Sequence, residues 1–69
     1  MEQNERKEIG KRIFAKRKEL KLTRAELGMK LGLHESTVKR YEDGDIKSVD
    51  IERLKEFAQA LHTNDSFLM

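Results

Sequence analysis

Residues 23–44, TRAELGMKLGLHESTVKRYEDG, constrain the fold of this chain more than any other stretch. Thr23 is a favourable N-cap, and Glu26 completes the capping-box pattern that marks the start of a helix. Gly32 predicts the end of that helix, because glycine adopts the left-handed conformation past a helix end at no steric cost. The apolar residues between them fall on one helical face, at i and i+4: Leu27 and Leu31.

A second short helix follows, and its predicted range is about Glu35 to Glu42. Leu33 is expected to be buried in the turn before it. Val38 and Tyr41 lie on the inward face of this helix, and Gly44 ends it.

Gly28 indicates how the two helices meet. Helices joined by a turn of three or four residues cross steeply, and their backbones come close together. A large side chain at the crossing would hold them apart, so the spacing of Gly28, Gly32 and Val38 is typical of a helix-turn-helix. The alternative is an ordinary pair of helices with two incidental glycines.

The rest of the chain predicts an all-α protein. Good helix formers are abundant, charged residues make up 41% of the sequence, and proline is absent. We expect 1–69 to form a single domain, a compact bundle of four to five short helices with the helix-turn-helix at about 23–43. The remaining predicted elements are a first helix from the N-cap Asn4 to about Leu20, a fourth of about Ile51–Leu61 after the N-cap Asp50, and a last turn Asp65–Met69 after the N-cap Asn64.

Helical periodicity also predicts the core. Outside the central pair, the expected inward residues are Ile9, Ile13, Leu20, Ile46, Ile51, Leu54, Phe57, Ala58, Leu61 and either Phe67 or Leu68. Phe14 points away from the stripe of the first helix. It either packs against a neighbouring segment or lies exposed near a partner.

Composition excludes several classes of protein. The chain has no cysteine, so it can form no disulfide and no thiolate metal site, and we expect no metal and no cofactor. No apolar run approaches the roughly 20 residues of a membrane span. The start, MEQNERKE, lacks the apolar stretch of a signal peptide. The chain stops abruptly on apolar residues, and we expect the natural protein to continue past them.

Positive charge is concentrated in the first part of the chain. Residues 1–41 hold 12 Lys and Arg against 6 Glu, whereas residues 42–69 hold 3 Lys and Arg against 7 acidic residues. This asymmetry suits a domain that presents one face to a polyanion. The alternative is a solvated, lysine-rich face on the first helix.

The run IGKRIFAKRKELKLTRAELGMKLGLHESTVKRYEDG resembles the phage repressor and Cro family of helix-turn-helix DNA-binding domains, of the lambda repressor-like, xenobiotic-response-element type. The resemblance extends from about Ile9 to Met69. The tail, GDIKSVDIERLKEFAQALHTNDSFLM, more narrowly resembles the amino-terminal domain of phage-type repressors whose second half is a self-cleaving peptidase. The resemblance implies that the second helix of the motif enters the major groove of double-stranded DNA, which is about 12 Å wide and admits one helix.

By the same resemblance, the base-reading positions are Glu35, Ser36 and Arg40, with Lys39 at their margin. Arg40 can bind guanine O6 and N7 with two hydrogen bonds, and Ser36 can donate or accept. Glu35 can only accept, from an amino group such as cytosine N4. For each residue the alternative is a solvated helix surface.

Other residues are expected to contact phosphates, which position a protein without reading sequence. Arg24 lies in the first turn of a helix, and the free N–H groups of that turn also point at the DNA backbone. We therefore expect Arg24 to bind a phosphate strongly. Thr37 and Lys47 are expected to be second contacts. His34 replaces the usual Ser or Thr cap of the reading helix, and either keeps that structural role or touches phosphate.

The resemblance also implies a structural pair. In the family an arginine of the first helix pairs with a glutamate at the end of the reading helix, and the matching residues are Arg17 and Glu42. The alternative is two solvent-exposed charges. Lys21 stands where relatives usually have glycine after the first helix.

These features together predict a transcriptional repressor or regulator that binds a palindromic operator as a homodimer. One domain makes few contacts, and symmetric half-sites supply the missing specificity, so we expect the isolated domain to be a monomer or weak dimer. The location implied is cytoplasmic and nucleoid-associated, in a bacterial or phage-encoded protein, with no membrane or small-molecule partner.

Two other function classes are weaker. One is a protein-interaction module, such as an antitoxin-type partner with weak or no DNA binding. Its support is Glu35, Asp43 and Asp45, because carboxylates weaken binding to DNA. The outward basic residues of the motif oppose it. An enzyme is supported least, because His34 and His62 have no serine, cysteine or carboxylate at a useful spacing.

Overall fold

The computed structural model describes residues 3–47 and 49–68, and that part of the chain contains five helices. In chain order they are α1 (Gln3–Glu19), α2 (Arg24–Leu31), α3 (Glu35–Asp43), α4 (Ile51–Ala60) and α5 (Asp65–Leu68). The predicted all-helical bundle of four to five short helices is confirmed.

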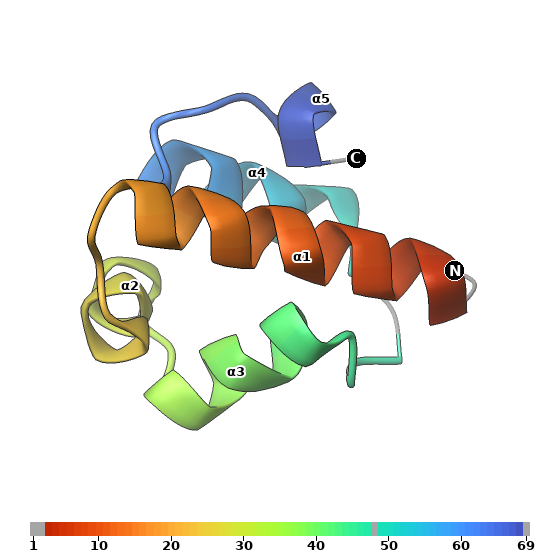
Figure 1. The fold of residues 1–69 in the computed structure, drawn as a ribbon, viewed down its shortest axis with the longest axis horizontal. Helices are drawn as coiled ribbons and strands as arrows, with labels where there is room; N and C mark the ends of the chain where they lie inside the picture. The colour runs from red at the N-terminus through yellow and green to blue at the C-terminus, as the bar shows by residue number, and fades with distance from the viewer. Residues whose placement is uncertain (1–2, 48, 69) are drawn as a thin grey trace.

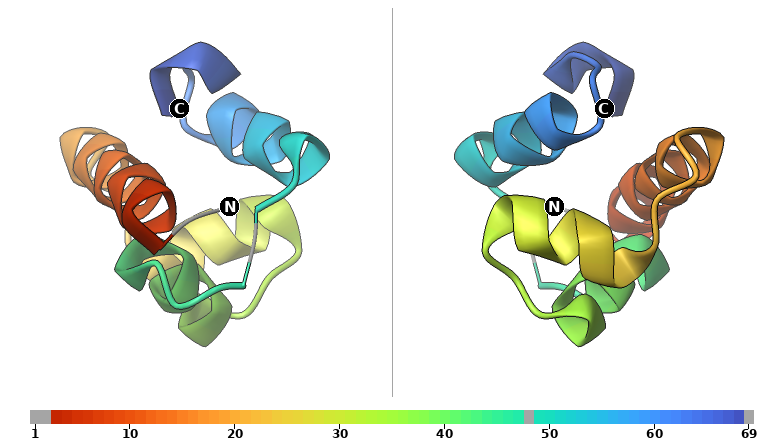
Figure 2. Two further views of the ribbon diagram at one scale, coloured as in Figure 1. Left: turned by 90° about the vertical axis from the view of Figure 1, so that its right-hand side faces the viewer. Right: turned by 90° about the vertical axis from the view of Figure 1, so that its left-hand side faces the viewer.

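Helix α1 contacts α3 and α5, whereas α4 contacts α2 and α5 (Figure 1). In the views of Figure 2, α1 and α4 lie on opposite sides of the molecule, with α2 and α3 below them and α5 above α4. In Figure 1, α2 is seen nearly end-on while α3 runs across, so these two helices cross steeply, as the further views in Figure 2 also show. Helix α2 contacts both α3 and α4.

The ends of α2 and α3 follow the predicted signals. The Thr23 hydroxyl accepts from the Glu26 amide at 3.0 Å, and the Glu26 carboxylate accepts from the Thr23 amide at 2.9 Å. Both bonds lower the pKa of Glu26 below its usual value, and the bond from the Thr23 backbone amide has the largest effect. Gly32 and Gly44 end the two helices in the left-handed conformation, with φ of 70° and 74°.

The predicted start of α1 is wrong, since Asn4 lies inside the helix and not at its N-cap. Neither glycine nor proline occurs among the first residues to interrupt the helix, and asparagine costs only about 0.7 kcal/mol relative to alanine within one. At the other end, Lys21 adopts the left-handed conformation usual for glycine, with φ 58°. Hydrogen bonds from the Lys21 and Leu22 amides to the carbonyls of Lys18 and Arg17 close this end in a Schellman pattern.

Most of the predicted core is buried, and Tyr41 packs on Phe57 with ring centroids 4.9 Å apart. Ile51 is a wrong prediction, because its side chain is 55% exposed. It is the first residue of α4 and lies beyond the core, whereas Val49, just before the N-cap Asp50, is buried in its place. An apolar residue preceding an N-cap commonly packs against the helix in this way. At the end of the chain it is Leu68 that is buried, while Phe67 stays about half exposed.

Two glycines permit the closest backbone approaches. A Cβ at Gly28 would collide with the carbonyl oxygen of Leu33, so the small residue is required by the turn itself. A Cβ at Gly10, within α1, would collide with the carbonyls of Tyr41 and Glu42 in α3, the first of them at 2.6 Å. Gly10 therefore sets how closely α1 lies against α3.

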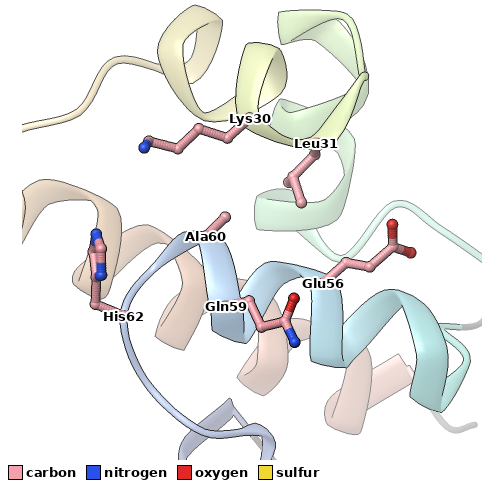
Figure 3. A pocket seen from close by; sticks show the side chains of 6 residues that line it. All are labelled: Lys30, Leu31, Glu56, Gln59, Ala60 and His62. Carbon is pink, nitrogen blue, oxygen red and sulfur yellow. The ribbon is translucent and has the colours of Figure 1, made fainter.

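A shallow pocket of about 330 Å³ opens between α2 and α4 (Figure 3). Its lining residues are Lys30, Leu31, Glu56, Gln59, Ala60 and His62. None of them is a residue that the sequence assigns to DNA contact. Within the described residues, no helix is both long and apolar enough to cross a membrane.

Replacing Gly10 with alanine tests the close approach of α1 and α3. Alanine normally strengthens a helix by about 1 kcal/mol relative to glycine. Here we expect Gly10→Ala to lower the free energy of unfolding by about 1–3 kcal/mol, the usual cost of overpacking. Urea denaturation followed by circular dichroism measures this. Lys11→Ala, at the exposed neighbouring position, is the control and should stay within about 0.5 kcal/mol of wild type; a Gly10→Ala variant as stable as wild type would contradict the account.

Candidate nucleic-acid interface

Helix α3 presents one polar face to solvent. Val38 and Glu42 are buried, Tyr41 is half-buried, and α1 and α2 pack against the helix on that side. The structure places the four predicted base-reading residues together on the exposed side: Glu35, Ser36, Lys39 and Arg40. Figure 1 shows this helix at the edge of the molecule, with no described helix lying beyond it.

The charges on this face are not equivalent. Lys39 Nζ lies 2.6 Å from the carboxylate of Asp43 one turn later, and both side chains are about half exposed. Exposed pairs of this kind contribute only about 0.3–0.5 kcal/mol, so Lys39 can leave Asp43 for another partner at little cost. Arg40 forms no salt bridge with any residue that the structure describes.

His34 acts as the N-cap of α3. Its Nδ1 accepts a hydrogen bond from the Ser36 amide at 3.1 Å and lies 2.9 Å from the Ser36 hydroxyl. The imidazole thus satisfies an amide that would otherwise lack a partner at the helix start. The structural role considered for His34 is the one that the structure shows, and its contact with phosphate stays a prediction. Thr37, another predicted phosphate contact, is half-buried.

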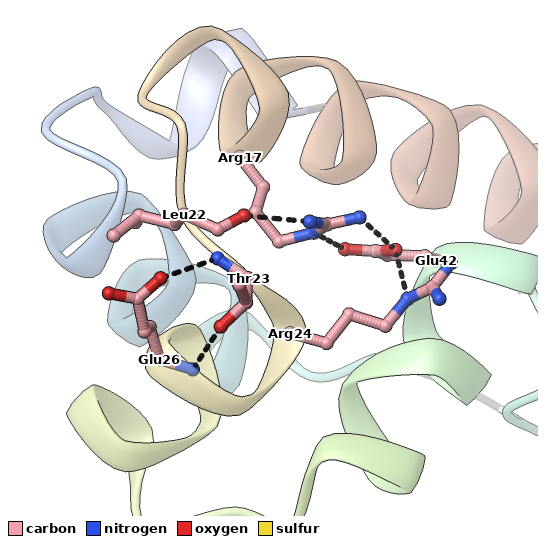
Figure 4. Close-up of polar contacts among 6 residues, drawn as sticks. All are labelled: Arg17, Leu22, Thr23, Arg24, Glu26 and Glu42. Carbon is pink, nitrogen blue, oxygen red and sulfur yellow. Dashed lines mark hydrogen bonds and ion pairs between the residues drawn. The ribbon is translucent and has the colours of Figure 1, made fainter.

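A buried carboxylate lies at the other end of α3 (Figure 4). Glu42, whose side chain is 2% exposed, accepts from Arg17 Nε at 2.6 Å and from Arg17 Nη2 at 3.3 Å. Arg17 also donates to the Leu22 carbonyl at 2.8 Å. The structure therefore brings together Arg17 and Glu42, the two residues that the resemblance pairs. Arg17 also binds the turn after α1 through the Leu22 carbonyl.

Arg24 is the third member of this cluster, which the sequence did not predict. Its Nε donates to Glu42 Oε1 at 2.9 Å, and its side chain is 34% exposed (Figure 4). A guanidinium has five N–H donors. The one on Nε is held by Glu42, whereas those on the terminal nitrogens have no hydrogen-bond acceptor among the described residues. Arg24 is thus oriented by the protein while part of its guanidinium stays available to a ligand.

The surface around Arg24 is basic and includes Phe14. A hollow of about 620 Å³ is lined by Phe14, Arg17, Lys18, Lys21, Leu22, Thr23, Arg24 and Glu35. The Phe14 ring is 41% exposed and lies 5.2 Å from the Arg17 guanidinium carbon, within cation–π range. Phe14 contacts Arg17 and Lys18 of its own helix and is not packed against a neighbouring segment of the described chain, and a partner beside its exposed ring stays a prediction. Lys18 and Lys21 were not assigned to a site, although their position just before the N-cap of α2 was a usable signal.

Lys47, the other predicted phosphate contact on the loop after α3, is exposed. It lines a pocket together with Arg40, so a predicted base-reading residue and a predicted phosphate contact are neighbours. Asp45 lines the same pocket and adds negative charge to it.

Comparison with known proteins adds a family and a fold. A family model described as Helix-turn-helix matches residues 13–68. No curated protein matches the sequence significantly. Similar solved structures include hydroxypropylphosphonic acid epoxidase from S. wedmorenis, with a TM-score of 0.87 and 23% identity over 93% of this chain and 34% of that chain. They also include Fe(II) HppE, with a TM-score of 0.86 and 24% identity over 91% of this chain and 33% of that chain.

These structural likenesses have a limited meaning. At 23–24% identity they show the fold alone. This chain also spans only about a third of the length of those proteins, so their chemistry does not transfer to it.

The Glu42 cluster predicts a large stability effect. Glu42→Gln keeps the shape of the side chain but removes the charge that compensates Arg17 and Arg24. Because breaking one side of a buried ion pair costs about 3–5 kcal/mol, we expect a loss of that size in urea denaturation. Glu56→Gln removes an exposed carboxylate 3.7 Å from Arg53 and should change stability by less than about 0.5 kcal/mol. A Glu42→Gln loss as small as that of the control would show that the cluster is not stabilising.

Proposed function

Because the chain belongs to the lambda repressor-like helix-turn-helix family, a family of DNA-binding domains, we propose that it regulates transcription by binding a specific duplex sequence with α3 in the major groove. The observation that carries the proposal is the exposed polar face of α3, held against α1 and α2 by the buried Glu42 cluster. A helix that enters a groove needs this combination of a free outer face and a fixed inner one.

Base recognition in this proposal comes from the outer face of α3. Arg40 binds the O6 and N7 atoms of a guanine, a contact that is worth about 1–3 kcal/mol of discrimination. Ser36 and Glu35 lie one to two turns earlier and contact neighbouring base edges, with Glu35 limited to amino groups. Lys39 exchanges its surface pair with Asp43 for an acceptor on the DNA.

Phosphate recognition positions the helix. Arg24, oriented by Glu42, donates its terminal N–H groups to a phosphate beside the N-terminus of α2. Lys47 and Thr37 are the second contacts, and His34 is a further one at the start of α3. None of these contacts reads sequence, but together they fix the register of α3 in the groove.

The proposed regulator acts as a repressor on a palindromic operator, in the cytoplasm. Its domain is a monomer or weak dimer alone and a homodimer on DNA, because two symmetric half-sites double the few contacts that one domain makes.

Selection of duplexes from a random pool tests this function directly. We expect a two-fold symmetric consensus with half-site centres about 10 base pairs apart. Enrichment of an asymmetric consensus would contradict the dimer. A pool in which no sequence is enriched, with no binding to mixed duplex at low salt, would contradict DNA recognition and favour the protein-interaction module.

Two variants separate base reading from positioning. Arg40→Ala should relax the preference at one base pair of each half-site, lowering discrimination there by about 1–3 kcal/mol. Arg24→Ala should weaken all sequences alike and reduce the salt dependence by about one phosphate contact. Fluorescence anisotropy on the consensus and on single-base variants measures both. Lys55→Ala, on the exposed side of α4, is the control and should change neither quantity.

A further inference from the structure

A second basic pocket lies beyond the end of α3, and part of it comes from the start of the chain. Its volume is about 290 Å³. Its lining residues are Arg6, Arg40, Gly44, Asp45, Ile46 and Lys47. Arg6 belongs to the first turns of α1, 41 residues before Lys47. The fold therefore places an arginine of the amino-terminal helix beside the loop that follows the reading helix.

Arg6 is held in place but is not satisfied. Its Nη1 donates to the backbone carbonyl of Lys47, which ties α1 to the loop. Its Nε is buried and has no hydrogen-bond partner among the described residues. A buried donor without an acceptor is costly, and a small shift of the guanidinium toward an anion would satisfy Nε together with a terminal nitrogen. Arginine binds phosphate oxygens in this two-bond geometry.

The charge around Arg6 favours an anion. Three of the lining residues are basic and only Asp45 is acidic, so the lining carries a formal charge of +2. Lys7 adds a further cation nearby, since its backbone and Cγ lie against Gly44. The carbonyls at the end of α3 also attract cations, so charge alone would be consistent with a purely structural arrangement. The unpaired Nε and the position beside Arg40 distinguish a ligand site from that arrangement.

We propose that Arg6 and Lys47 bind a backbone phosphate of duplex DNA in this pocket, next to Arg40 on the reading face. The inference rests on the proposed function of α3. A helix in the major groove is flanked by sugar–phosphate strands, and a pocket at the end of that helix faces one of them. Arg6 is then a phosphate contact supplied by α1, outside the helix-turn-helix motif.

The salt dependence of duplex binding tests the role of Arg6. Each phosphate contact contributes about 0.9 to the slope of log K against log salt for B-DNA. We expect Arg6→Gln to reduce the slope by about that amount on every duplex, so that the affinity advantage of wild type shrinks about 3.5-fold between 50 and 200 mM salt. The control is Lys11→Gln, which removes the same charge from an exposed position of α1 and should leave the slope unchanged.

A conservative variant separates phosphate binding from the tie to the loop. Arg6→Lys keeps the charge and is expected to keep the wild-type slope, even if it loosens the contact with the Lys47 carbonyl. If Arg6→Gln retains the wild-type slope, or if Arg6→Lys loses as much slope as Arg6→Gln, Arg6 is only a structural tie and the inference is wrong. In either of these outcomes, the wild-type protein still binds duplex DNA with a steep slope of log K against log salt. A wild-type protein without salt-dependent duplex binding would instead refute the proposed function itself.

Discussion

The arrangement of this domain depends on one buried carboxylate. Glu42 comes from the end of α3 and is shared by Arg17 of α1 and Arg24 of α2, while Arg17 also holds the carbonyl of Leu22. Three helices and a turn are thus joined at a single charged group. Burying that charge is costly unless it is paired and hydrogen-bonded, and here three N–H donors compensate it. The observed orientation of α3 places this carboxylate where both arginines reach it.

Close backbone contacts act together with the cluster. Gly10 lets α1 lie directly against the carbonyls at the end of α3, beside the residue that Arg17 binds. Gly28 lets the turn fold back on α2, which sets the steep crossing of α2 and α3. A chain of 69 residues buries only about 60% of its unfolded surface, so it has little hydrophobic stability to spare. Specific contacts of this kind therefore decide which of several compact arrangements the chain adopts.

The sequence predicted the features that local rules determine. Capping at Thr23, termination at Gly32 and Gly44, and the burial of Val38 follow from patterns within a few residues. One local rule failed, since Asn4 lies inside α1 and not at its N-cap, and the other error arose where tertiary packing decides. Periodicity placed Ile51 in the core, but the helix begins beyond the core and Val49 is buried instead.

The same limit applies to the site. The exposed face of α3 could be predicted, because periodicity separates it from Val38 and Tyr41. The Arg17–Glu42 pair could be predicted only from the family resemblance. The contact of Arg24 with Glu42 could be predicted neither from periodicity nor from the resemblance. The contact between Arg6 and the carbonyl of Lys47 joins residues far apart in sequence, and no spacing rule identifies it. Gly10 was overlooked, although a lone glycine inside a helix is itself a signal of close packing.

The central claim is that α3 and the start of α2 form the DNA-contacting surface. The most direct measurement is amide chemical-shift mapping by NMR, on ¹⁵N-labelled protein titrated with a short duplex at low salt. The account predicts that the largest shifts occur at the start of α2 and along residues 35–40, with little change around the pocket between α2 and α4. Shifts concentrated at Glu56, Gln59 and His62, with α3 unaffected, would contradict it.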